Sequence, residues 1–183
     1  MTSHTYDIRD TESLPLQPCI RGCLETLEQG HRFLQSIDDH QYTCSAPPHL
    51  SSSIGEHFRH LLDLFHAVRQ PTGVIDYNTR RRGHAVERTR HIAISEVEQL
   101  RDWLKQLNHA NLTLPVRVRT EVSLSQQEAC DMMSTIEREL TFVALHATHH
   151  YALARVAVSL NHIEVSDNFG FAPATVSYLR EKN

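Results

Sequence analysis

The sequence lacks the features that mark membrane proteins and secreted proteins. It contains no stretch of 18 apolar residues, which a membrane-spanning helix requires. Its first 18 residues lack the basic start and the apolar run of a signal peptide. Its four cysteines show no Cys-x-x-Cys spacing, which excludes a zinc ribbon and a dithiol redox motif. We therefore expect a cytoplasmic protein that contacts no membrane and keeps its cysteines reduced.

The chain also lacks an excess of positive charge. Its 18 lysines and arginines face 22 aspartates and glutamates, which gives a net charge of −4 and a pI near 6.4. This balance argues against a nucleic-acid partner bound through bulk positive charge. We find no internal repeat, low-complexity run or interdomain linker. The 183 residues, 40% of them hydrophobic, fit one compact domain spanning residues 1–183.

What the sequence does contain is a set of apolar residues at helical spacing. The predicted helices are 18–36, 53–69, 92–108 and 135–160, with a short closing helix over 173–180. Two capping boxes, Ser53 with Glu56 and Ser134 with Glu137, mark helix starts.

The connections between these helices differ in character. Alternating apolar and polar residues over 113–122 predict a strand, paired with 128–133 as a small β-hairpin between the third and fourth helices. The polar segment 70–83 is a long connection between the second and third helices. Four helices joined in this way predict a mainly all-α fold, an antiparallel four-helix bundle.

The fourth predicted helix carries a histidine motif within the segment TFVALHATHHYALAR. His146 and His150 lie four residues apart, so their rings project from one helix face and can hold one metal ion such as Zn, Ni, Fe or Cu. The segment lacks the glutamate of the His-Glu-x-x-His protease motif, so further ligands must come from elsewhere. His149 points away from this face and is interpreted as a hydrogen-bonding, pocket or surface residue.

The second predicted helix offers the partners. A helical wheel places His57 nearer the apolar side than His60, which lies at the margin of the apolar stripe but suits a ligand at an open end of the bundle. Both remain candidates for the ligand from this helix, and His57 is otherwise a residue that supports the ligands or lines the pocket. Asp63 either orients a ligand imidazole or is a solvated carboxylate.

Two further groups of charged residues are candidates. The run Arg80–Arg82 is either an anion clamp for a substrate carboxylate or phosphate, or a solvated basic loop. Glu139 lies seven residues before His146 and therefore on nearly the same helix face. It is interpreted as a base, as support for a ligand, or as the partner of an arginine.

These residues resemble the DinB superfamily, and within it a bacterial subgroup. The resemblance is carried by a Ser-Ile-Gly helix start with a histidine five residues after the glycine, followed late in the chain by His-x-x-x-His. The phrases GEHFRHLLDLF, IDYNTRRRG, RELTFVALHATHHYALAR and NFGFAPATVSY strengthen it, and it extends from about residue 52 onward. The resemblance implies a DinB-type four-helix bundle whose divalent metal, Zn or Ni, is bound by His60, His146 and His150.

The resemblance also implies a function. Several DinB-like proteins are metal-dependent thiol transferases, so we expect a hydrolase or a low-molecular-weight-thiol S-transferase acting on a small molecule, with a thiol as co-substrate. Homodimers are frequent among similar proteins and are expected here. The competing hypothesis is a non-catalytic metal-binding or interaction protein with a structural metal site. A role on DNA is disfavoured by the acidic charge balance.

Overall fold

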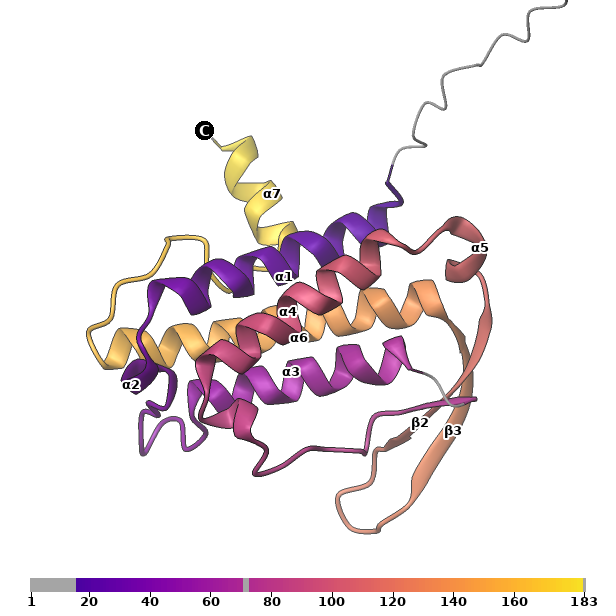
Figure 1. Ribbon diagram of the computed structural model, residues 1–183, viewed down its shortest axis with the longest axis horizontal. Helices are drawn as coiled ribbons and strands as arrows, with labels where there is room; N and C mark the ends of the chain where they lie inside the picture. The colour runs from indigo at the N-terminus through magenta and orange to yellow at the C-terminus, as the bar shows by residue number, and fades with distance from the viewer. Residues whose placement is uncertain (1–15, 71–72, 183) are drawn as a thin grey trace, which may run out of the picture.

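The computed structural model describes residues 16–70 and 73–182, which form a mainly helical fold with a small sheet (Figure 1). In chain order the elements are α1 (Pro18–Ser36), α2 (Asp39–Tyr42), α3 (Ile54–Arg69), β1 (Val74–Asp76), the 3-10 turn η1 (Ala85–Glu87), α4 (Arg90–Lys105), α5 (His109–Leu112), β2 (Pro115–Glu121), β3 (Ala129–Thr135), α6 (Ile136–Leu160) and α7 (Pro173–Glu181). The predicted class, mainly α with a small hairpin, is confirmed at this level. No helix in these two stretches has the length and apolar character needed to cross a bilayer.

Four long helices, α1, α3, α4 and α6, lie side by side and share one apolar core (Figure 1). Helices α1 and α6 run in one direction and α3 and α4 in the other. Helix α6 packs against α1 and α3, and α4 packs against the same two helices. Two of these neighbouring pairs are therefore parallel, because the chain crosses the length of the molecule between α3 and α4.

Helix α3 begins with the capping box that the sequence predicted. The Ser53 hydroxyl accepts the Glu56 amide, and the Glu56 carboxylate accepts the Ser53 amide, which confirms the capping box. The capping box predicted at Ser134 is wrong. Helix α6 is capped one residue later by Thr135, whose hydroxyl accepts from the Arg138 amide, because strand β3 continues to Thr135 without an intervening loop.

The hairpin between α4 and α6 is confirmed, and a third strand extends it. Strands β2 and β3 pair antiparallel from Pro115 opposite Thr135 to Glu121 opposite Ala129. Strand β1, which was not predicted, pairs parallel with β2, with Ile75 opposite Val118. The long connection from α3 to α4 is thereby tied to the hairpin at one end of the helices.

Ion pairs attach the same connection to α3 and α4. Arg81 donates from Nη1 and Nη2 to the two carboxylate oxygens of Glu96 on α4, at 2.9 and 2.8 Å, and it also pairs with Asp63 on α3. Arg59 on α3 donates from Nε to Glu87 of η1 at 2.9 Å and from Nη1 to Asp63 at 3.3 Å. Arg59, Asp63 and Glu87 are buried, so these charges depend on one another for partners.

We predict opposite effects for two glycine-to-alanine substitutions. A Cβ at Gly55 would overlap the carbonyl oxygen of Glu87, because η1 packs directly on this turn of α3. Gly55→Ala should destabilise the fold by about 1–3 kcal/mol, the usual cost of overpacking. Gly22 in α1 has no atom near its Cβ position, so Gly22→Ala should stabilise by about 0.5–1 kcal/mol. Urea unfolding of both variants measures the difference, and equal effects would contradict the close packing at Gly55.

We predict that the ion pairs of Glu96 lose their effect in acid. Burial opposes ionisation, but hydrogen bonds from His66 and Arg81 outweigh it and lower the pKa of Glu96 to about 2 from 4.5. A depressed folded-state pKa contributes stability that is complete above about pH 5 and is lost as pH falls from 4.5 towards 2. Glu96→Gln should therefore cost about 1–3 kcal/mol at pH 7 and progressively less below pH 4.5.

The measurement is urea unfolding of the wild type and of Glu96→Gln from pH 7 to pH 3. Glu128→Gln is the control, because Glu128 is exposed and its side chain has no ion pair or hydrogen bond in the described part of the chain. A stability difference that stays constant down to pH 3 would contradict the assignment.

Candidate metal centre

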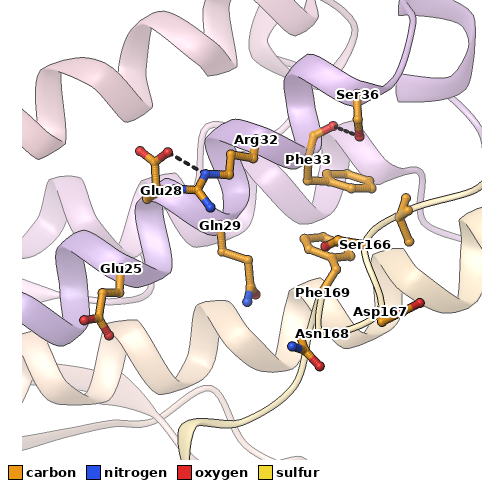
Figure 2. A pocket seen from close by; sticks show the side chains of 11 residues that line it. Glu25, Glu28, Gln29, Arg32, Phe33, Ser36, Ser166, Asp167, Asn168 and Phe169 are labelled. Carbon is orange, nitrogen blue, oxygen red and sulfur yellow. Dashed lines mark hydrogen bonds and ion pairs between the residues drawn. The ribbon is translucent and has the colours of Figure 1, made fainter. Parts of the chain in front are cut away.

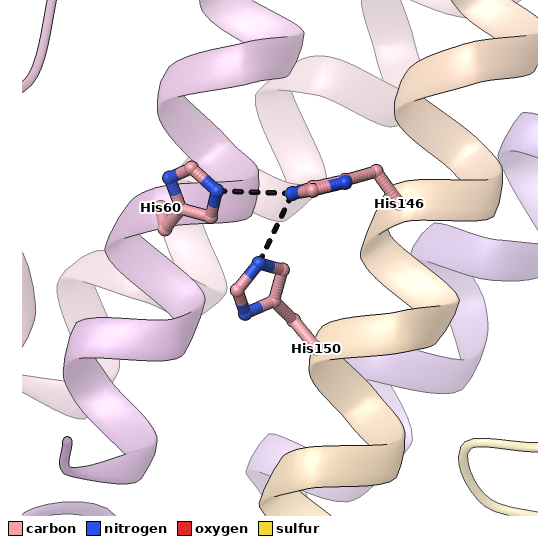
Figure 3. Close-up of side chains that lie close together, drawn as sticks. All are labelled: His60, His146 and His150. Atoms are coloured by element: carbon pink, nitrogen blue, oxygen red, sulfur yellow. Dashed lines mark hydrogen bonds between the residues drawn. The ribbon is translucent and has the colours of Figure 1, made fainter. Parts of the chain in front are cut away.

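Three imidazole rings from two helices meet at the face where α3 packs on α6 (Figure 3). His60 comes from α3, and His146 and His150 come from successive turns of α6. The Nε2 atom of His146 lies 3.0 Å from Nε2 of His60 and 3.1 Å from Nε2 of His150. One ligand atom from each of the three residues lies within 4.8 Å of the others.

This spacing fits a bound divalent metal. Ring nitrogens at about 2.0–2.1 Å from a tetrahedral zinc ion stand about 3.3 Å apart, close to the two distances measured at His146. Within residues 16–70 and 73–182, these three histidines are the only group of three or more His, Cys, Asp or Glu residues spaced to hold a metal. Three protein ligands leave a fourth position for water or a substrate.

The three rings are held in the neutral form, which is the form that binds metals. Burial, the charge of Arg80 and the neighbouring His146 lower the pKa of His60 to about 3. Burial and the surrounding histidines lower the pKa of His150 to about 2, and burial also lowers the pKa of His146. At neutral pH each ring therefore has one nitrogen with a free lone pair.

His57 lies behind this centre rather than in it. Its Nδ1 atom is 2.9 Å from Nδ1 of His150, the ring nitrogen on the side away from His146. The helical wheel correctly placed His57 deeper than His60, because His57 is only 6% exposed. If Nε2 of His150 presents its lone pair, Nδ1 carries the proton and donates it to His57. His57 then sets the tautomer and orientation of His150.

Asp63 and His149, the other two residues predicted to support the ligands or line the pocket, have different surroundings. The Asp63 carboxylate accepts from Arg59 and Arg81, and no hydrogen bond joins it to a histidine among the described residues. It therefore anchors the connection from α3 to α4. His149 is exposed, with its ring centre 6.0 Å from that of His146.

Glu139, the carboxylate considered as a base, is almost completely buried, and both of its oxygens accept hydrogen bonds. Its two oxygens accept from the hydroxyl groups of Tyr77 and Ser134, at 2.7 and 2.6 Å, and from Arg138 at 2.9 Å. Burial and this carboxylate together raise the pKa of Tyr77, so the phenol keeps its proton. The hydrogen bond from Tyr77 to Glu139 therefore joins the start of α6 to the segment that follows β1.

A hollow of about 500 Å³ opens beside the histidine centre. Its lining is Arg138, Thr141, Phe142, Leu145, His146 and His149. His146 belongs to both the centre and the hollow, so a molecule lying there can reach the ring cluster. Apart from the histidines, the residues that line this hollow were not predicted from the sequence. They nevertheless recur at helical spacing along one side of α6 around His146.

A larger hollow of about 710 Å³ lies between α1 and the segment 165–169 (Figure 2). Phe33 and Phe169 stack in its wall with ring centres 4.1 Å apart, and Glu28 is paired with Arg32 there. No histidine lines it. This hollow therefore carries none of the metal-binding chemistry of the α3–α6 face.

Comparison with known proteins does not assign the chain to a family. No family model matches it, and no solved structure matches it. FK506-binding protein 5 of the fungus Rhizopus delemar is 24% identical over 109 residues, which cover 60% of this chain and 28% of that protein. The chain thus matches less than a third of the length of this relative, at low identity.

We predict that His57 tunes the metal affinity without being a ligand. In His57→Phe the Nδ1 proton of His150 loses its acceptor, so the affinity for Zn²⁺ should fall about 10- to 100-fold while the stoichiometry at saturation is kept. His57→Gln offers an amide oxygen in place of Nδ1 and should restore part of the affinity. Competition with a chromophoric chelator measures both. Full loss of binding in His57→Gln would instead make His57 a ligand.

Proposed function

We propose that this chain is a metal-dependent enzyme of the DinB superfamily, a hydrolase or a low-molecular-weight-thiol S-transferase. The observation that carries the proposal is the meeting of His60, His146 and His150 from two helices, with their ligand atoms within 4.8 Å. The order of the motifs along the chain and the side-by-side packing of four long helices support the same assignment. Zn²⁺ and Ni²⁺ suit three imidazole ligands.

The chemistry follows from an open coordination position. His60, His146 and His150 would hold a divalent metal through neutral imidazoles, and the metal would lower the pKa of a bound water or thiol and supply hydroxide or thiolate at neutral pH. His57 holds the His150 ring in place through the Nδ1–Nδ1 contact of 2.9 Å. The hollow lined by Phe142 and Leu145 admits the substrate beside His146. In this proposal the substrate is a small molecule and the protein acts in the cytoplasm as a homodimer.

A non-catalytic protein with a structural metal site is the alternative, and one observation favours it. The Nε2 atom of His57 is buried and has no hydrogen-bond partner among the described residues. A rotated His57 ring would supply a fourth nitrogen and close the site, as structural zinc sites are closed. Removal of a structural metal lowers the unfolding temperature strongly, whereas an open catalytic site tolerates it better.

We predict one metal ion per chain in the purified protein. Plasma mass spectrometry should find it in the wild type and show its loss in His60→Ala, His146→Ala and His150→Ala, because each removes one of three ligands. His149→Ala is the matched control, since this exposed ring lies on the same helix next to His150. His57→Ala should retain the metal when Zn²⁺ is in excess.

The outcomes separate the hypotheses. Metal that survives the loss of His60 or of the two α6 histidines would refute the proposed centre. Metal lost in His57→Ala, together with a large fall in unfolding temperature on chelation, would favour the structural site. Metal retained in His57→Ala, with a Co²⁺-substituted absorption spectrum that changes when a small thiol is added, would support the open catalytic site.

A further inference from the structure

Arg80 differs from the other arginines near the centre because its guanidinium has no partner. Within the described part of the chain no hydrogen bond or ion pair involves Arg80, although its Nη1 atom is buried. Arg81, its neighbour, is held by Asp63 and Glu96, and Arg82 is exposed to solvent. A buried donor without an acceptor typically costs 1–3 kcal/mol, and more when it is charged. Arg80 therefore has donors for an acceptor that the described residues do not supply.

The nearby carboxylates are already engaged. Both oxygens of Asp63 accept from Arg59 or Arg81. The two oxygens of Glu87 accept from Arg59 and from the amide of Gly83. Asp76, whose charge also acts on Arg80, accepts the Asn78 amide at Oδ1, and no hydrogen bond or ion pair joins it to Arg80 in the described part of the chain. A bound molecule can therefore supply the acceptor for Arg80.

Two observations relate Arg80 to the histidine centre. The connection that carries Arg80 contacts α6 at Tyr77, whose ring packs 5.3 Å from that of Phe142. Phe142 lies one helical turn before His146, and these two rings are 5.6 Å apart. The positive charge of Arg80 acts on both His60 and His146 and lowers the pKa of each. A divalent ion bound at the histidines would add two more positive charges to this region, which favours the binding of an anion.

We infer that the molecule bound at the three-histidine centre carries an oxyanion group, a carboxylate or a phosphate, which Arg80 binds while the apolar remainder lies in the hollow lined by Phe142 and Leu145. The inference rests on the proposed function for the presence of the metal. It adds the class of substrate, a small organic anion. Guanidinium groups bind carboxylate and phosphate through paired hydrogen bonds, so both sources share one recognition chemistry.

The test uses simple aromatic probes on the zinc-loaded full chain. Isothermal titration calorimetry should detect binding of benzoate or phenyl phosphate, and the neutral isostere benzamide should bind at least ten-fold more weakly. Arg80→Gln should weaken anion binding at least ten-fold, as expected for the loss of a charge-assisted hydrogen bond. Arg82→Gln is the matched control and should leave the affinity unchanged, because Arg82 is exposed. Arg80→Lys keeps the charge and should retain part of the affinity.

The failure of this inference can be distinguished from that of the metal proposal. Metal content is measured on every sample, and the titration is repeated on metal-free protein. Zinc-loaded protein that binds neither anion, or binds them equally well in Arg80→Gln, overturns the inference and leaves the metal centre standing. If the chain takes up no metal but still binds the anions in an Arg80-dependent way, the result supports the inference about Arg80 and refutes the metal proposal.

A purely structural role for Arg80 gives a different result. Because the guanidinium lacks an acceptor, Arg80→Gln should unfold at the same temperature as the wild type or higher. A clear fall in unfolding temperature would show that Arg80 serves the fold, and would overturn the inference.

Discussion

The packing of α3 against α6 is the constraint on which the rest of the structure depends. One histidine on α3 and two on α6 have to face one another across this contact, and small changes in the rotation of either helix would separate their ring nitrogens. Helix geometry fixes the spacing of His146 and His150, whereas only tertiary packing brings His60 to them. Rigid elements are better suited to such a task than loops, because a shift of about 1 Å is enough to spoil a metal site.

The connection between α3 and α4 serves both the fold and the centre. Its ion pairs with Arg59, Asp63 and Glu96 hold it against α3 and α4, and strand β1 pairs it with the hairpin. The same segment carries Arg80, whose charge lowers the pKa of His60 and of His146. Arg80 makes no hydrogen bond or ion pair in the described part of the chain, unlike Arg59 and Arg81, which anchor the segment.

Features that depend on local periodicity could be predicted from the sequence, whereas features that depend on tertiary packing could be predicted less well. The four long helices, the hairpin and the capping box at Ser53 were predictable because each depends on neighbouring residues. The choice between His57 and His60 was not, because it depends on how α3 is rotated against α6. Strand β1 has three residues and is too short to show a pattern. The ion pair between Asp63 and Arg81 joins residues 18 apart, and a helical wheel cannot predict it because Arg81 lies in an irregular segment.

The separation of the histidines along the chain has a consequence for how the protein is made. His60 and His146 are 86 residues apart, and α6 is the last of the long helices to be synthesised. A nascent chain that has completed α1, α3 and α4 contains three of the four long helices and only one of the three ring nitrogens. Because domains begin to fold from the N-terminal side during synthesis, the centre is assembled only after α6 leaves the ribosome. Incomplete chains therefore lack the centre altogether.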